Sequence, residues 1–160
     1  MKIFLELATA EDAPVLHIMQ KAAFQPLLDK YQDFETSPAN ESIERLLLRI
    51  EHPSGRFYKI IADGELAGGI RVHWRDNRQY WIGPLFVDPS YQGFGIAQEV
   101  MKRVEEIFAQ AATWELATIL EERGNCHLYE KLGYEQTGKT EKLNGKTTLG
   151  YFKKEGAARE

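Results

Sequence analysis

The chain has 160 residues, of which 43% are hydrophobic and 28% are charged, a composition that predicts a folded domain and argues against disorder. Its 20 Lys and Arg residues and 24 Asp and Glu residues give a net charge of −4, which disfavours nucleic acid as a partner because phosphate binding needs a positive surface. The one cysteine, Cys126, cannot form an internal disulfide, and no apolar run reaches the ~20 residues of a membrane span. We therefore expect a cytoplasmic protein without a membrane partner, with a single domain over residues 1–154 and a frayed tail over residues 155–160.

The first elements are a strand and two helices. Apolar and wetter residues alternate over residues 2–7, which predicts a strand. Thr9 is a candidate N-cap for a helix that has Pro14 in its first turn and extends to about Phe24 or slightly beyond. Helical spacing is lost between residues 25 and 40 and resumes in a second helix near residues 40–51.

The middle of the chain predicts a three-stranded meander followed by a crossover. Two β-rich runs, residues 56–62 and 66–74, flank Asp63-Gly64, a strong hairpin signal. A third strand over residues 79–87 contains Gly83-Pro84, where proline removes a hydrogen-bond donor and predicts a bulge or a local splaying of strands. A helix over residues 96–112 and a buried strand over residues 114–120 then imply a βαβ connection.

The remaining elements are a short helix and a pair of strands. The helix covers residues 125–132, with Asn125 as its N-terminal cap and Gly133 and Tyr134 in the positions that end it. Asn144-Gly145 marks the turn between the last strands, which end near Phe152. The order β-α-α-β-β-β-α-β-α-β-β predicts an α+β fold around a mixed sheet.

The strongest chemical signal lies between the third meander strand and the long helix, in the sequence Gln92-Gly93-Phe94-Gly95-Ile96-Ala97. Small residues at a helix N-terminus let anionic oxygens approach free backbone amides and the positive end of the helix dipole. The loop lacks the Lys-Ser/Thr of a P-loop and the third glycine of the dinucleotide fingerprint. It predicts a diphosphate ligand bound by neither of those folds, and an ordinary tight turn is the structural alternative.

This loop resembles the Q/R-x-x-G-x-G/A acetyl-coenzyme A loop of the GCN5-related N-acetyltransferases (GNAT), and residues 128–134 resemble the second signature of that family. The resemblance covers nearly the whole chain and implies the GNAT acyl-CoA N-acyltransferase fold, with acetyl-CoA as cosubstrate and a homodimer as the family-level assembly. It implies that Tyr129 lies near the thioester sulfur and protonates the leaving thiolate. The candidate coenzyme-binding residues are Leu85, Phe86, Val87, Gln92, Gly93, Phe94, Gly95, Ile96, Ala97, Asn125, Tyr129 and Lys131.

The general base is not defined by a motif. Many family members carry a glutamate on the strand before the loop, but residues 79–87 contain neither an acid nor a histidine. Glu122 and Glu121 precede the Tyr129 helix and are candidates, with water as the alternative base and a solvated loop charge as the structural alternative. The four histidines and Cys126 show no metal-ligand spacing, so no metal is expected.

We therefore expect an N-acetyltransferase that moves acetyl from acetyl-CoA to a primary amine, on a small molecule or a peptide, by direct attack in a ternary complex. The net charge slightly favours cationic amines. Two alternatives stay open: a non-catalytic acyl-CoA binding or sensing module, and a phosphate-binding interaction domain. Aromatic residues near the N-terminal helices and the meander either pack in the core or line an acceptor pocket; they are Phe24, Tyr31, Phe34, Trp74 and Trp81.

Overall fold

A computed structural model describes residues 1–76 and 78–157 of the chain. Its centre is a seven-stranded sheet in the order β1-β2-β3-β4-β5-β7-β6, in which β4 and β5 are parallel and the other neighbours are antiparallel. The strands are β1 (Ile3–Leu7), β2 (Gly55–Ala62), β3 (Glu65–Trp74), β4 (Gln79–Val87), β5 (Thr113–Ile119), β6 (Glu135–Asn144) and β7 (Thr147–Glu155). The helices are α1 (Ala13–Tyr31), α2 (Ile43–Glu51), α3 (Ile96–Ile107) and α4 (Arg123–Lys131), with short 3-10 turns at η1 (Ala10–Asp12), η2 (Pro38–Asn40) and η3 (Pro89–Tyr91).

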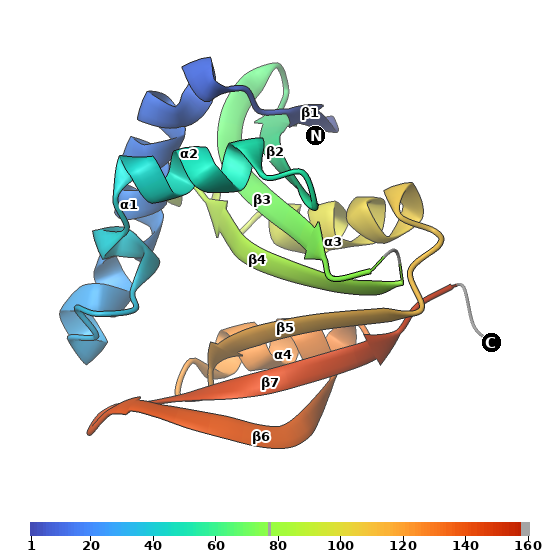
Figure 1. Ribbon diagram of the computed structural model, residues 1–160. Helices are drawn as coiled ribbons and strands as arrows, with labels where there is room; N and C mark the ends of the chain where they lie inside the picture. The colour runs from blue at the N-terminus through green and yellow to red at the C-terminus, as the bar shows by residue number, and fades with distance from the viewer. Residues whose placement is uncertain (77, 158–160) are drawn as a thin grey trace.

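Helices cover both faces of the sheet, with α1 and α2 on one face and α3 and α4 on the other (Figure 1). Alternation along the strands sends side chains to both sides. Ile70 and Val72 of β3 belong to the larger core under α3 and α4, where Trp114 is also buried. Phe57 and Phe86 belong to the smaller core under α1 and α2. Two cores on opposite sides of the sheet fix the register of its central strands.

The turn between β2 and β3 and the end of α4 have the conformations predicted from the sequence. Asp63 and Gly64 have positive φ angles of 50° and 84° in the β2–β3 turn, as a tight hairpin requires. Gly133 also has a positive φ, 99°, and its amide bonds to the Glu130 carbonyl while the Tyr134 amide bonds to the Tyr129 carbonyl. This double hydrogen bond is the Schellman ending predicted for α4.

The C-terminal ends of two helices, α1 and α3, differ from the prediction. The helix α1 continues past Pro26 and ends at Tyr31. Burial of the Leu28 and Tyr31 side chains stabilises these two additional turns. At the other end of the chain, α3 ends at Ile107, five residues before the predicted end.

The predicted cap of α4 is wrong. Because the helix begins at Arg123 and Glu122 occupies the cap position, Asn125 lies inside the first turn. No side chain caps this helix among the described residues.

Part of the tail that was expected to be frayed is held by the sheet. Glu155 belongs to β7, and the Gly156 amide donates a 2.7 Å hydrogen bond to the Ala112 carbonyl. Residues 158–160 of that tail lie outside the described residues. Within residues 1–76 and 78–157, no helix combines the length and the apolar character needed to cross a membrane.

Candidate active site

The sheet opens in its middle, between β4 and β5. Among the described residues these strands pair where Gln79–Trp81 meets Thr113–Glu115, and they diverge after that (Figure 1). The divergence begins at the Gly83-Pro84 bulge: β3 pairs Ile70 with Leu85 and Val72 with Ile82, so the single residue Arg71 faces two residues of β4. The splaying predicted from Gly83-Pro84 is therefore confirmed.

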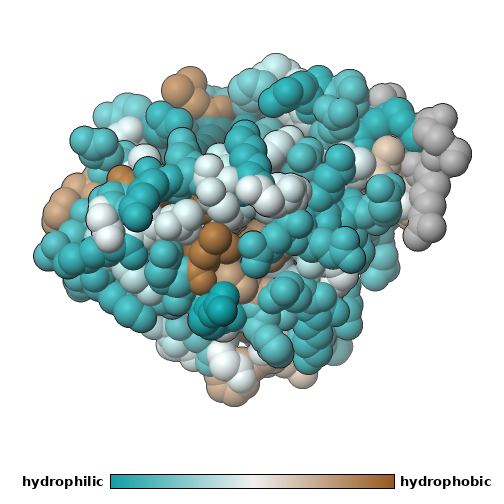
Figure 2. Space-filling view, turned by 90° about the horizontal axis from the view of Figure 1, so that it is seen from below, coloured by the Kyte–Doolittle hydropathy of each residue, from teal (hydrophilic) through white to brown (hydrophobic). Residues whose placement is uncertain are grey.

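A cavity of about 690 Å³ fills this opening. One side is lined by the end of β4, the loop after it and the start of α3. The lining residues there include Leu85, Phe86, Val87, Gln92 and Ala97. The opposite side is lined by the end of α1, the loop after it and the β6–β7 hairpin, including Tyr31, Asp33, Thr36, Leu143 and Leu149. Figure 2, seen from below, shows hydrophobic surface exposed in the middle of a largely hydrophilic face. Such a concave, mostly apolar space with a few polar groups is typical of a ligand site.

The glycine-rich loop has the conformation that anion binding requires. Gly93 and Gly95 have φ angles of 87° and 76°, and α3 begins directly after Gly95. The first hydrogen bond into α3 runs from the Glu99 amide to the Gly95 carbonyl (3.2 Å), so the amides of residues 96–98 have no carbonyl partner among the described residues. The Gln92 side chain donates to the Val87 carbonyl (2.9 Å) and fastens the loop to the end of β4. The loop thus presents unpaired donors next to the cavity.

Tyr129 lines the cavity from α4 and packs against the rings of Tyr134 and Phe152, each with its centroid 6.3 Å away. Its hydroxyl has no hydrogen-bond partner within the part of the chain that the structure describes. Burial, with a smaller effect of the Cys126 thiol, raises the pKa of Tyr129 to about 12. The hydroxyl is therefore protonated at neutral pH and available to donate a hydrogen bond into the cavity.

Glu122 also lines the cavity, but its carboxylate is engaged. It accepts hydrogen bonds from the Tyr31 hydroxyl (2.5 Å) and from Lys30 Nζ (3.1 Å). The bond from Tyr31, helped by the Lys30 charge, lowers the pKa of Glu122 below its ordinary value. Glu121 turns away from the cavity and accepts from the Thr148 amide (2.8 Å), which lowers its pKa as well.

The cavity brings together most of the predicted residues, but Gly93, Phe94, Gly95 and Ile96 are not among its lining. Ile96 is buried in the larger core, and Phe94 is 65% exposed. Asn125 lines the cavity, whereas Lys131 is exposed in the last turn of α4 and does not. Among the five aromatic candidates Phe24 and Tyr31 line it; Phe34 is 62% exposed, and Trp74 and Trp81 pack elsewhere. The sequence reasoning missed the wall built by Asp33, Thr36 and the β6–β7 hairpin, for which no local pattern exists.

Comparisons with known proteins agree on the fold. The model of the Acetyltransferase (GNAT) family matches residues 21–134, well over half of the chain. No curated protein sequence gives a match.

Several solved structures share the architecture over nearly their full length. A spermidine N-acetyltransferase from Vibrio cholerae, in complex with CoA and spermine, is 19% identical with a TM-score of 0.78, over 98% of this chain and 96% of that one. The PaiA N-acetyltransferase from Thermoplasma acidophilum, in complex with coenzyme A, is 18% identical with a TM-score of 0.75, over 97% and 99%. The ribosomal-protein-S18-alanine N-acetyltransferase from Escherichia coli is 14% identical with a TM-score of 0.77, over 96% and 94%.

Proposed function

Because the chain belongs to the Acetyltransferase (GNAT) family, we propose that it transfers an acetyl group from acetyl-CoA to a primary amine by direct attack in a ternary complex. The observation that carries this proposal is the cavity, which begins at Gln92 and Ala97 on either side of the two glycines and reaches through the β4–β5 opening to the end of α1. Two substrates that enter from opposite sides meet at Gly83 and Pro84. Holding them there supplies much of the rate enhancement of a reaction between two bound molecules.

The coenzyme diphosphate lies against the amides after Gly93, where the dipole of α3 favours negative charge. The pantetheine arm runs along residues 85–87, whose edge facing β5 lacks a strand partner in the described pairing. Asn125 contacts the arm from α4, while Lys131, outside the cavity, is left with only a long-range attraction for the nucleotide phosphates.

Tyr129 donates a hydrogen bond to the thioester sulfur as the thiolate leaves. With a pKa of about 12, complete proton transfer to a thiolate whose conjugate acid has a pKa of about 8.5 costs roughly 5 kcal/mol. Tyr129 therefore acts as a general acid that shares its proton with the developing thiolate. The proton that finally resides on the sulfur balances the proton that the attacking nitrogen loses as the amide forms, which is distinct from the one that the ammonium loses before attack.

Glu122 is poorly suited to remove a proton from an alkylammonium group. Its lowered pKa makes such a transfer strongly uphill from an ammonium whose pKa is about 10. The amine therefore loses its proton to water, and the ionised Glu122 holds Tyr31 and attracts the amine electrostatically.

An acceptor screen tests the proposal. The protein is incubated with acetyl-CoA and a panel of primary amines that includes polyamines and peptides with free N-termini, because structural neighbours are named for such acceptors. Release of free thiol that depends on the amine supports transfer. Binding of acetyl-CoA without thiol release for any amine favours the acyl-CoA binding module, and failure to bind a coenzyme A column leaves only the phosphate-binding domain.

A further inference from the structure

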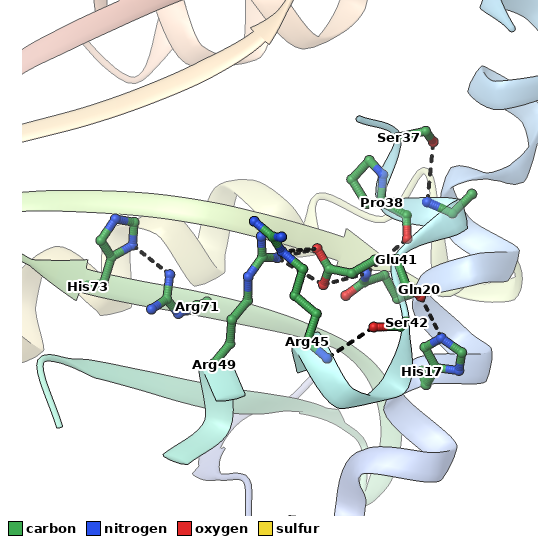
Figure 3. A network of polar contacts seen from close by, with 11 residues as sticks. His17, Gln20, Ser37, Pro38, Glu41, Ser42, Arg45, Arg49, Arg71 and His73 are labelled. Carbon is green, nitrogen blue, oxygen red and sulfur yellow. Dashed lines mark hydrogen bonds and ion pairs between the residues drawn. The ribbon is translucent and has the colours of Figure 1, made fainter. Parts of the chain in front are cut away.

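A cluster of three arginines lies at the margin of the smaller core, on the sheet face that α2 covers (Figure 3). Arg45 and Arg49 project from α2, and Arg71 projects from β3. One carboxylate, that of Glu41, balances them: it lies 2.9 Å from Arg49 and 3.7 Å from Arg45 and also accepts from Gln20. Among these four ionised groups, positive charge is in excess.

Arg71 is the member without a carboxylate partner among the described residues. Its Nη1 donates to His73 Nδ1 (3.0 Å), and its Nε is buried without any hydrogen-bond partner in the described chain. Burial and the neighbouring Arg49 lower the pKa of Arg71 to about 10, so the guanidinium remains charged at neutral pH. A half-buried cation with an unused donor is costly unless an anion meets it.

His73 offers a second hydrogen-bond donor, its Nε2–H, beside Arg71. Burial and the nearby arginines lower the pKa of His73 to about 4, so the ring is neutral at pH 7. Because Nδ1 accepts from Arg71, the ring proton resides on Nε2. The ring stacks on Trp81 at 6.4 Å and an interplanar angle of 13°, which fixes its plane.

Arg71 lies beside the opening in the sheet by strand register, and neither its side chain nor that of His73 is among the residues that line the cavity. Arg71 is the β3 residue that faces Gly83 and Pro84, both of which line the cavity. Neighbouring strands lie about 4.8 Å apart, so the base of the Arg71 side chain is one strand away from the point where the substrates meet.

We propose that the acceptor is an amine that also carries an oxyanion, a carboxylate or a phosphate, which Arg71 and His73 bind while the amino group lies at Gly83 and Pro84. The proposal rests on the proposed function and names the substrate class of the same site. A guanidinium and an imidazole N–H match the oxygens of either oxyanion.

Matched acceptors test this pairing. One arm uses ω-amino carboxylates, from glycine to 6-aminohexanoate, against their amides; the other uses phosphoethanolamine against ethanolamine. We expect kcat/KM to be about tenfold or more higher for the anionic member of one arm, which identifies the oxyanion. Arg71→Gln removes this preference, because it lowers kcat/KM for the anionic member more than for the neutral member. Arg45→Gln is the control, because Arg45 already has Glu41, and it retains the preference.

Two results overturn the proposal: equal or better use of the neutral member in both arms, or equal losses with both members in Arg71→Gln. A binding measurement separates this failure from that of the proposed function. Inorganic phosphate and acetate are expected to raise the melting temperature of the unmodified chain and of Arg45→Gln more than that of Arg71→Gln. Binding at the glycine-rich loop contributes equally to all three. Identical shifts in the three proteins contradict the anion site even if amines are acetylated, whereas a smaller shift in Arg71→Gln supports it even if no amine is.

Discussion

The Tyr31 hydroxyl donates a 2.5 Å hydrogen bond to the Glu122 carboxylate, and so joins the last residue of α1 to the residue before α4, 91 positions later. Two further bonds reinforce the junction: Asn144 Nδ2 donates to the Tyr31 carbonyl (2.9 Å), and Lys146 Nζ donates to the Gln32 side chain (3.1 Å). The end of α1 is thus fastened to the start of α4 and to the β6–β7 hairpin.

Tyr31→Phe is expected to reduce the loss of folding stability that the chain suffers as the pH is lowered. The folded pKa of Glu122 is lowered, so its contribution to stability is present above its ordinary pKa of 4.5 and is lost as the pH falls through the folded value. Without the hydroxyl the folded pKa moves back toward 4.5. The melting temperature of the unmodified chain should therefore fall more between pH 6 and pH 3 than that of the variant.

Tyr151→Phe is the control for this measurement, since its hydroxyl has no hydrogen-bond partner within the described residues. It should follow the unmodified chain across the pH range. Parallel curves for all three proteins would show that the Tyr31–Glu122 bond does not set the pKa of Glu122.

Tyr129→Phe is expected to lower kcat by roughly 10- to 100-fold, because it deletes the hydroxyl that we propose donates to the departing sulfur. Affinity for acetyl-CoA should change little, since the ring still packs against Phe152. The test is kcat and KM on a confirmed acceptor between pH 6 and pH 9. In the unmodified enzyme the rate should rise with pH, because the amine loses its proton while Tyr129, with a pKa of about 12, keeps its own.

Tyr58→Phe is the matched control, because Tyr58 is a half-buried tyrosine outside the cavity lining whose pKa is also raised by burial. Its kcat should equal that of the unmodified chain. An unchanged kcat in Tyr129→Phe removes Tyr129 from the mechanism and leaves positioning and solvent as its basis.

Gly95→Val is expected to abolish the stabilisation that acetyl-CoA confers, about 2.7 kcal/mol at 100 times Kd. A Cβ at Gly95 meets no atom within 4 Å, so the effect is on the backbone: valine disfavours the φ of 76° that aims the loop amides. Gly64→Val is a close control, with a φ of 84°, equally open space and a position in the β2–β3 turn. Both variants should lose similar intrinsic stability, but only Gly64→Val should keep the ligand-induced shift in melting temperature.

Gly68→Ala is expected to destabilise the fold by about 2 kcal/mol or more, because a Cβ there collides with the Phe86 carbonyl and lies 3.0 Å from the Val87 Cα. Gly124→Ala is the opposite case: open space within α4 should give a gain of about 0.5–1 kcal/mol. Urea unfolding of both variants measures the difference. Equal stabilities would mean that β3 and β4 do not need the close approach at Gly68.

The features that can be predicted from the sequence are those that depend on residues close together in the chain. Asp63-Gly64 specifies a turn, Gly133 ends a helix, and Gly93 and Gly95 specify a loop with positive φ angles before an amphipathic helix, because each depends on φ angles or amides within a few positions. Gly83-Pro84 predicts the opening of the sheet for the same reason.

The remaining features depend on partners far away in the chain. Pro26 argues for an end of α1 near Phe24, and only the burial of Leu28 and Tyr31 overrides it. No spacing pattern predicts the hydrogen bond from Tyr31 to Glu122. Nor does one predict that Arg49 has a carboxylate partner and Arg71 has none among the described residues. A sequence motif is therefore enough to name Tyr129 as a catalytic candidate. The residues that form the walls of the cavity can be identified from the folded chain alone.

Because the pairing in the described part of the chain joins β4 to β5 at three residue pairs, the sheet consists of two half-sheets with a short seam at Gln79–Trp81. A pantetheine arm, which carries its own amide groups, would lie in the open part as an additional strand made of ligand. The coenzyme would then complete the sheet as well as react within it. Backbone amides of β4 beyond Trp81 that face the opening should exchange with deuterium readily in the free protein and slow markedly with coenzyme A bound, whereas those at the seam should be protected in both states.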